Sequence, residues 1–171
     1  MSDQNIAILK EIATKTCTLF EDENRYLTDD ELKNLCIRKG TLDFDERKII
    51  ENHASVTLKI LNQLPFPNRL ARVPEFAGGH HEKLDGTGYP RGLKEEDLPL
   101  QTRILAIADV FEALTAKDRP YKEPMKLSQA VKIMGFMKND KHIDPDIYDL
   151  FINLGLHRRY AEKEMNPDQI D

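Results

Sequence analysis

"PLQTRILAIADVFEALTA", residues 99–116, is the most apolar segment of this 171-residue chain and decides its fold class. Pro99 is suited to the first turn of an α-helix, where no intrahelical bond needs its missing N–H group. The apolar residues after it cover nearly the whole circumference of a helix, and a helix of that kind has to be buried. The stretch therefore predicts a buried helix in a packed domain.

Helical spacing of apolar residues continues on both sides of this segment. Thr28 with Glu31 and Asp43 with Glu46 are spaced as capping boxes. No segment alternates at period two for long enough to require a strand. We expect an all-α fold, a compact helical bundle of about six to seven helices. Predicted helices include residues 2–20, 28–37, 43–64, 74–80, 128–138 and 145–155. We expect three parts: a helical segment (1–32), a main domain (33–155), and a polar helix with a tail (156–171).

The composition narrows the class of protein. A formal charge of −5 argues against binding of polymeric nucleic acid, and 40% hydrophobic with 32% charged residues is typical of a globular domain. No apolar run is long enough to span a membrane. Cys17 and Cys36 lack the spacing of a metal site or a disulfide framework, which indicates reduced thiols and a cytoplasmic location.

Two polar residues interrupt apolar helix faces. His53 lies within the apolar stripe of residues 43–64, where it is either a hydrogen-bonded core histidine or a metal ligand. Asp109 lies in the apolar helix of residues 99–116, where a buried carboxylate needs a cation or good donors. A buried salt bridge and a metal ligand both satisfy that need.

His80 and His81 are adjacent and follow Gly78-Gly79. On a regular helix their side chains would diverge by about 100°, so they would bind two neighbouring ions. They can share one ion if the backbone leaves the helix at the glycines, and a chance pair of exposed histidines is the alternative. Three histidines with one aspartate suit a borderline transition metal such as iron or manganese.

The segment after the histidines is rich in turn residues. Gly86 and Gly88 suit positive φ angles and close approach of the backbone to a ligand. Tyr89, held by Pro90, is placed to present its ring or hydroxyl to a nucleobase or a phosphate. A plain surface loop explains the glycines but not their pairing with adjacent histidines.

With these residues identified, "HHEKLDGTGYPRGL" (80–93) resembles the signature of the HD-GYP domain, found in bacterial metal-dependent phosphodiesterases that hydrolyse cyclic di-GMP in signal transduction. The resemblance continues in order through three further segments and covers roughly residues 33–152, so the predicted domain of residues 33–155 is HD-GYP-like. Those segments are "RKGTLDFDERKIIENHA" (38–54), "RILAIADVFEALTAKDRPYK" (103–122) and "HIDPDIYDLF" (142–151).

The resemblance implies a role for each matching residue. The metal ligands would be His53, His80, His81 and Asp109, holding a divalent transition metal, with iron or manganese expected. A metal-bridging hydroxide would attack phosphorus in line. Tyr89 would bind the nucleotide, and Arg119 and Lys122 would contact phosphate. Residues expected to support the ligands or the loop are Glu82, Asp85, Gly86, Gly88 and Pro90.

One departure concerns the adjacent His-Asp pair for which the family is named. The chain contains no His-Asp dipeptide, its first histidine is His53, and the lysine that follows the pair is also missing. Either the pair precedes residue 1 in a longer protein, the explanation we favour, or the domain is degenerate. No catalytic residue is assignable, and we expect the chain alone to be weakly active or inactive.

The expected partners follow from the same considerations. They are a cyclic dinucleotide, an upstream sensory or catalytic segment of the same parent protein, and a second copy of the chain if exposed apolar surface drives dimerisation. No membrane and no polymeric nucleic acid are expected. The alternative functions are a degenerate, non-catalytic module that binds a nucleotide or a protein, and a plain helical scaffold.

Overall fold

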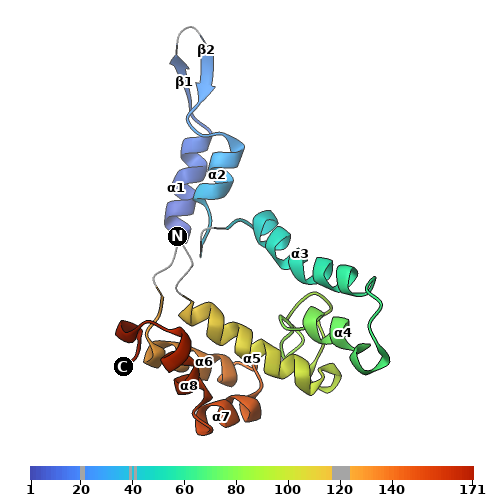
Figure 1. The fold of residues 1–171 in the computed structure, drawn as a ribbon. Coiled ribbons are helices and arrows are strands. Elements are labelled where there is room, and N and C mark those ends of the chain that lie inside the picture. The colour runs from blue at the N-terminus through green and yellow to red at the C-terminus, as the bar shows by residue number, and fades with distance from the viewer. Residues whose placement is uncertain (20–21, 39, 41, 117–123) are drawn as a thin grey trace. The chain divides into compact units, whose positions relative to one another are not determined.

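The computed structural model describes the chain except residues 20–21, 39, 41 and 117–123 (Figure 1). The chain divides into two compact units, Met1–Ile50 and Glu51–Asp171. The described part contains eight α-helices and one two-stranded antiparallel sheet. The predicted all-α class is confirmed, with a short hairpin added to it.

The first unit contains α1 (Asp3–Ala13), β1 (Thr16–Leu19), β2 (Asp22–Arg25) and α2 (Asp29–Leu35). The prediction of one helix over residues 2–20 was wrong. The helix ends at Ala13, and the chain enters a hairpin in which Thr16 pairs with Arg25. The physical reason is the run "TKTCT" (14–18), whose β-branched threonines are restricted in a helix and favour a strand.

The predicted capping boxes at the starts of α2 and α3 (Phe44–Leu61) are both present. The Thr28 hydroxyl accepts from Glu31 N at 3.2 Å, and the Glu31 carboxylate accepts from Thr28 N at 2.9 Å. The Asp43 carboxylate accepts from Glu46 N, and the Glu46 carboxylate accepts from Asp43 N, both at 2.8 Å. Helix α3 begins in the first unit and continues into the second.

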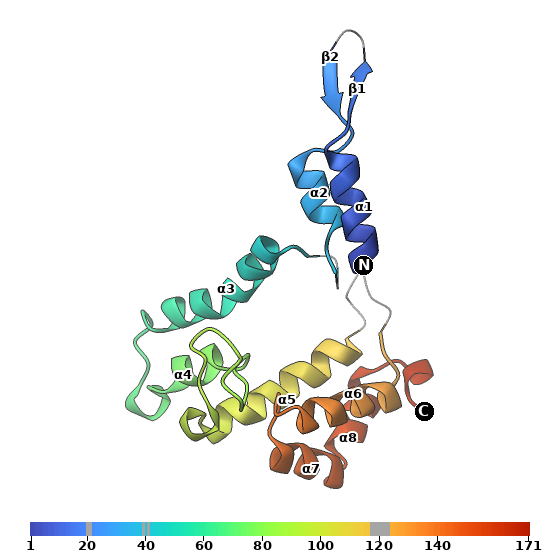
Figure 2. The ribbon, with the colours of Figure 1, turned by 180° about the vertical axis from the view of Figure 1, so that it is seen from behind.

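In its described residues, the second unit consists of helices joined by loops, with one isolated β-bridge between Asp85 and Lys94. Helix α5 (Leu100–Thr115) packs against α4 (Val73–Gly78), α6 (Leu127–Asn139) and α7 (Pro145–Asn153). Helix α8 (Leu156–Glu164) packs against α6 and α7 (Figures 1 and 2). The core is built on Ile107 and Phe111 of α5 and Ala130 and Met134 of α6. The second unit also contains three 3-10 turns: η1 (Asn68–Leu70), η2 (Glu95–Asp97) and η3 (Pro167–Gln169).

The start of α7 is fixed by an ion pair with α5. Asp144 caps α7 by accepting from Asp146 N and Ile147 N at 2.9 and 3.0 Å. Its second oxygen accepts from the Arg103 guanidinium at 2.7 Å, and the carboxylate is nearly fully buried. Because a buried charge is stable only when it is paired, this contact fixes α7 against α5.

The described residues include no helix of the length and hydrophobicity that crossing a bilayer requires.

Candidate metal and nucleotide site

The site lies where α3 and α4 approach each other in the second unit. Helix α4 ends at Gly78, and Gly79 follows outside the helix. A Cβ on Gly78 would lie only 2.8 Å from Leu58 Cδ1 of α3. The absence of a side chain at Gly78 therefore lets α3 come close to the segment that carries the adjacent histidines.

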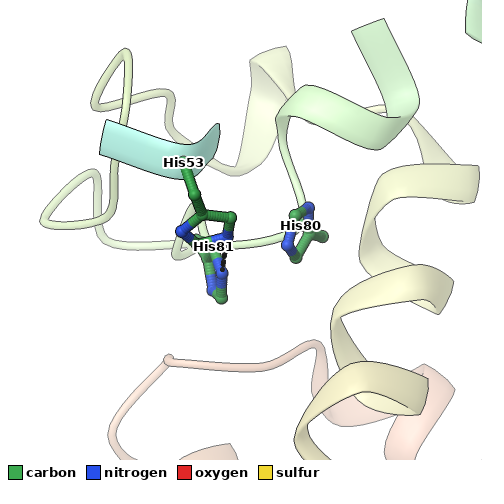
Figure 3. A group of neighbouring side chains, drawn as sticks. All are labelled: His53, His80 and His81. Atoms are coloured by element: carbon green, nitrogen blue, oxygen red, sulfur yellow. Dashed lines mark hydrogen bonds between the residues drawn. The ribbon is translucent and has the colours of Figure 1, made fainter. Parts of the chain in front are cut away.

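His53, His80 and His81 converge (Figure 3). One ring nitrogen from each lies within 4.8 Å of the others, and the Nε2 atoms of His53 and His81 are 3.0 Å apart. The rings of His80 and His81 have centroids 4.1 Å apart, because the backbone has left the helix before them. His53 is exposed, so the alternative of a buried core histidine does not describe it.

The donor set fits a transition metal. Two imidazole nitrogens at about 2.1 Å from one ion and at right angles to each other are separated by about 3 Å. The distance from His53 Nε2 to His81 Nε2 matches that separation. His80 Nδ1 lies 2.6 Å from Ala77 O, and since a carbonyl only accepts, Nδ1 carries the proton. The lone pair of His80 is then on Nε2, the atom a metal would use.

Burial makes His81 a neutral imidazole at physiological pH. The pKa of His81 is lowered to about 4, mainly by burial and then by the neighbouring His80 and His53, while the Asp109 carboxylate opposes the shift. Only a deprotonated nitrogen binds a metal, so this environment favours the ligand form.

Asp109 lies near this group without belonging to it. Its side chain is half-buried on α5, and its charge acts on both His81 and Tyr89. Among the described residues, the group of ligand atoms within 4.8 Å contains the three histidines and not Asp109. The structure therefore brings together three of the four residues expected to bind a metal and leaves the fourth beside them.

The loop after the histidines is closed by Glu82. Its carboxylate is 3% exposed and accepts from Arg91 N at 2.7 Å and from Leu93 N at 2.9 Å. Asp85 is exposed and accepts from the N–H and hydroxyl of Thr87 at 2.9 and 2.7 Å. Both carboxylates thus accept hydrogen bonds from other residues of the same loop.

Gly86 and Gly88 have different functions in this loop. Gly86 has a φ of 79°, the positive angle expected from the sequence. A Cβ on Gly88 would lie 2.5 Å from Glu82 Cα and 2.6 Å from His81 O. The close approach at Gly88 is therefore to the start of the loop itself.

This folding places Tyr89 on His81. Tyr89 N donates to His81 O at 3.2 Å, and the two rings stack with centroids 4.7 Å apart and planes inclined by 30°. Burial raises the pKa of Tyr89, and the charges of Glu51 and Asp109 raise it further, so its hydroxyl stays protonated. Pro90 follows through a cis peptide bond and is half-buried.

Two further residues near the site, His142 and Glu51, were not predicted from the sequence to have a role. His142 is half-buried, and its pKa is lowered by burial and by Lys83; its charge in turn acts on His81. Its place in "HIDPDIYDLF" was the available signal. Glu51, two residues before His53 on α3, acts electrostatically on Tyr89. Arg119 and Lys122, the expected phosphate contacts, lie outside the described residues.

Comparison with known proteins identifies the family. The HD domain family model matches residues 28–147. A 3'3'-cGAMP-specific phosphodiesterase of Vibrio cholerae is 43% identical over 113 residues, which are 65% of this chain and 23% of that protein. A probable cyclic di-GMP phosphodiesterase of the same species is 40% identical over 141 residues, 77% of this chain and 32% of the relative.

A cyclic di-GMP phosphodiesterase of Thermotoga maritima is 35% identical over 120 residues, 70% of this chain and 32% of the relative. The chain thus spans between 23% and 32% of the length of these three proteins. Phosphohydrolases with an HD domain depend on metal, and the three-histidine group is able to bind one. The sequence match, the loop after the histidines (residues 82–93, the GYP loop) and the histidine group agree: the chain belongs to the HD domain family and carries a phosphohydrolase domain of the HD-GYP type.

Proposed function

We propose that this chain is the part of a cyclic-dinucleotide phosphodiesterase that carries the GYP loop, with cyclic di-GMP as the preferred substrate, in bacterial signal transduction. The convergence of His53 with His80 and His81 carries the proposal, because three imidazole nitrogens from two separate segments lie within 4.8 Å of one another and form a donor set that suits a transition metal. The relatives, which are named for action on cyclic di-GMP or cGAMP, support the substrate class.

The metal would be held by His53, His80, His81 and Asp109, with iron or manganese as the preferred ions. Histidine and carboxylate donors suit these borderline metals. Asp109 becomes a ligand if its carboxylate moves towards the histidines when the ion binds. A bound divalent ion supplies Lewis acidity at the phosphate and lowers the pKa of its water.

The residues of the chain bind and orient the nucleotide. Tyr89 offers a protonated hydroxyl and the ring face that is turned away from His81, and a base stacks favourably on such a face. Arg119 and Lys122 supply cations to the phosphate oxygens. Glu82 holds the loop closed, and Asp85, Gly86, Gly88 and Pro90 set its shape.

A second function is favoured by one observation, the absence of a His-Asp dipeptide from the sequence. Without that pair and its lysine, none of the residues assigned above donates a proton to the leaving group. We infer weak or no turnover by the chain alone, and a non-catalytic nucleotide- or protein-binding module is the second candidate. A cytoplasmic location, a homodimer and an upstream sensory or catalytic segment complete the proposal.

The test uses the purified chain reconstituted with Fe²⁺ or Mn²⁺. Metal content by elemental analysis, cyclic di-GMP affinity by calorimetry, and product formation by chromatography are measured on the same sample. We expect bound metal, nucleotide binding and little turnover. A chain that takes up no metal and binds no nucleotide contradicts the proposal. Binding without hydrolysis, also in a longer chain that includes a His-Asp pair, favours the second candidate.

A further inference from the structure

A small cavity lies between the GYP loop, helix α5 and the residues that start α7. Its volume is about 10 Å³, taken as the space open to the centre of a water molecule. All of the residues that line it are buried except Arg103 and His142, which are half-buried. A cavity of this volume has room for about one water molecule.

Two residues that line this cavity each carry a buried polar atom with no hydrogen-bond partner in the part of the chain that the structure describes. These atoms are Thr102 Oγ1 and Arg103 Nε. Thr102 is 2% exposed. The Arg103 guanidinium donates to the Asp144 carboxylate through Nη1 at 2.7 Å, and this bond does not use its Nε–H. Because a buried polar atom without a partner is costly, two of them at one cavity indicate that a bound molecule pairs with both.

The groups around the cavity select the kind of molecule that fits. Arg103 Nε carries a hydrogen, so its partner has to accept a hydrogen bond, which a metal ion or an ammonium ion cannot do. The carboxylates of Glu82 and Asp144 also belong to the lining and are 3% and 5% exposed, so they disfavour an anion. A neutral molecule that both accepts and donates satisfies these groups, and water is the one that the volume admits.

We propose that this cavity is a binding site for one ordered water molecule. The water accepts a hydrogen bond from Arg103 Nε, bonds to the Thr102 hydroxyl, and donates to the carboxylates of the lining. Gly79 and Glu82, which stand on either side of the two adjacent histidines, line the same cavity. The water therefore joins the segment that carries these histidines to α5 and to the start of α7.

Thr102→Val tests the water by the sign of its effect on stability. Valine keeps a methyl group at the position of Cγ2, which packs in front of Gly79, and it replaces the hydroxyl by a second methyl group. Loss of a hydrogen bond to the water should raise the unfolding equilibrium constant by about two- to tenfold. If the hydroxyl has no partner, valine removes an unsatisfied buried group, and an unfolding constant that is unchanged or lower overturns the inference. Urea denaturation followed by circular dichroism measures the constant.

Thr115→Val is the matched control. Thr115 lies on the same helix and is also 2% exposed, but its hydroxyl donates to Phe111 O at 2.8 Å. This variant measures what the same substitution costs at a buried threonine of α5 whose hydrogen bond is known. Thr102→Val should raise the unfolding constant to a similar extent. Destabilisation by Thr115→Val without destabilisation by Thr102→Val would show that the Thr102 hydroxyl has no bound partner.

Electron density answers the same question directly. A crystal structure of the unaltered chain, at a resolution that shows ordered water, should contain a water within hydrogen-bond distance of Thr102 Oγ1 and Arg103 Nε. The Thr102→Val crystal should lack this water or show it displaced. A dry cavity or an ion in the unaltered chain overturns the inference, whatever the two valine variants do to stability. These measurements require neither a metal nor a nucleotide, so their result is independent of the proposed function.

Discussion

The ring of Tyr89 stacks on the ring of His81, with centroids 4.7 Å apart. One face of a candidate metal ligand is thereby covered by the side chain proposed to bind the nucleotide. The stack is a direct contact between the parts of the site proposed to bind the metal and the nucleotide. Substitution of Tyr89 should therefore alter metal affinity, and substitution of His81 should alter nucleotide affinity.

Replacing Tyr89 tests the ring. Tyr89→Ala should weaken cyclic di-GMP binding by about tenfold or more, since stacking of one base on an aromatic ring contributes about 1–3 kcal/mol. Tyr89→Phe should retain most of the affinity, because it keeps the ring and loses only the hydroxyl. Calorimetric titration of both variants measures the difference, and equal affinity in Tyr89→Ala and the unaltered chain would remove Tyr89 from the nucleotide site.

Replacing His53 tests the metal site. His53→Ala removes one of three convergent nitrogens, so the affinity for Mn²⁺ or Fe²⁺ should fall by at least about 100-fold, beyond the loss typical of residues that only support a ligand. His142→Gln is the control, because His142 is half-buried near the site but outside the ligand group. Competition with a chelating dye measures both. A similar loss in the two variants would argue against a specific three-histidine site.

The metal-free chain should lose stability as the pH falls. The pKa of His81 is lowered from 6.5 to about 4 in the folded protein, so the unfolded chain takes up a proton at a higher pH than the folded one. The contribution of His81 is complete above pH 6.5 and declines as the pH drops from there to about 4. Urea unfolding in the presence of a chelator should show a shallower decline for His81→Gln, and identical slopes would contradict the assignment.

Replacing Glu82 tests the closure of the loop. In Glu82→Gln one of the two backbone N–H groups, Arg91 N or Leu93 N, faces an amide donor and loses its acceptor. The free energy of unfolding should fall by about 1–3 kcal/mol, the cost of an unsatisfied buried polar group. Asp85→Asn, which alters an exposed turn, should change it by much less. Urea denaturation of the two variants provides the comparison, and a neutral Glu82→Gln would be inconsistent with a closing role.

Replacing Gly88 tests the close approach of the loop to its own start. In Gly88→Ala the new Cβ meets the backbone at Glu82 and His81, which cannot move aside as a flexible side chain could. We expect a loss of stability larger than for Gly155→Ala, where the φ of 64° is unfavourable but the surrounding space is open. Thermal unfolding of both variants measures the order, and the reverse order would show that the loop shifts to accommodate a methyl group.

The sequence predicts the helices better than the contacts between them. Apolar spacing located α3 and α5 through α7 within a few residues. Burial accompanies this spacing in α5 and α6, whereas α3 buries only Ala54 and leaves Ile49 and Ile60 exposed. The error at residues 14–19 arose because the threonines after Ala13 stop the apolar repeat from continuing as a helix. Turn signals in the GYP loop identified the positive φ of Gly86, which is a local property.

The remaining features depend on contacts between distant residues. The meeting of His53 with His81 requires α3 to approach α4 at Gly78, and no spacing rule specifies that approach. Gln169 lies in a stretch whose sequence indicates only a polar tail. Its side chain donates to Thr115 O and Met125 O, which are 54 and 44 residues away in the sequence. Buried hydrogen bonds of this kind leave no periodic signal.

The closure made by Glu82 has a consequence for protein engineering. Because the Glu82 carboxylate accepts hydrogen bonds from Arg91 N and Leu93 N, residues 82–93 begin and end at nearly the same place. A segment whose two ends lie close together can be exchanged as a unit. The exchange requires that the backbone match at the two neighbouring ends of the segment and that Glu82 be retained. If Tyr89 binds the nucleotide as proposed, moving these twelve residues among HD domains should transfer nucleotide preference, while each recipient keeps its own residues at the positions of His53, His80 and His81.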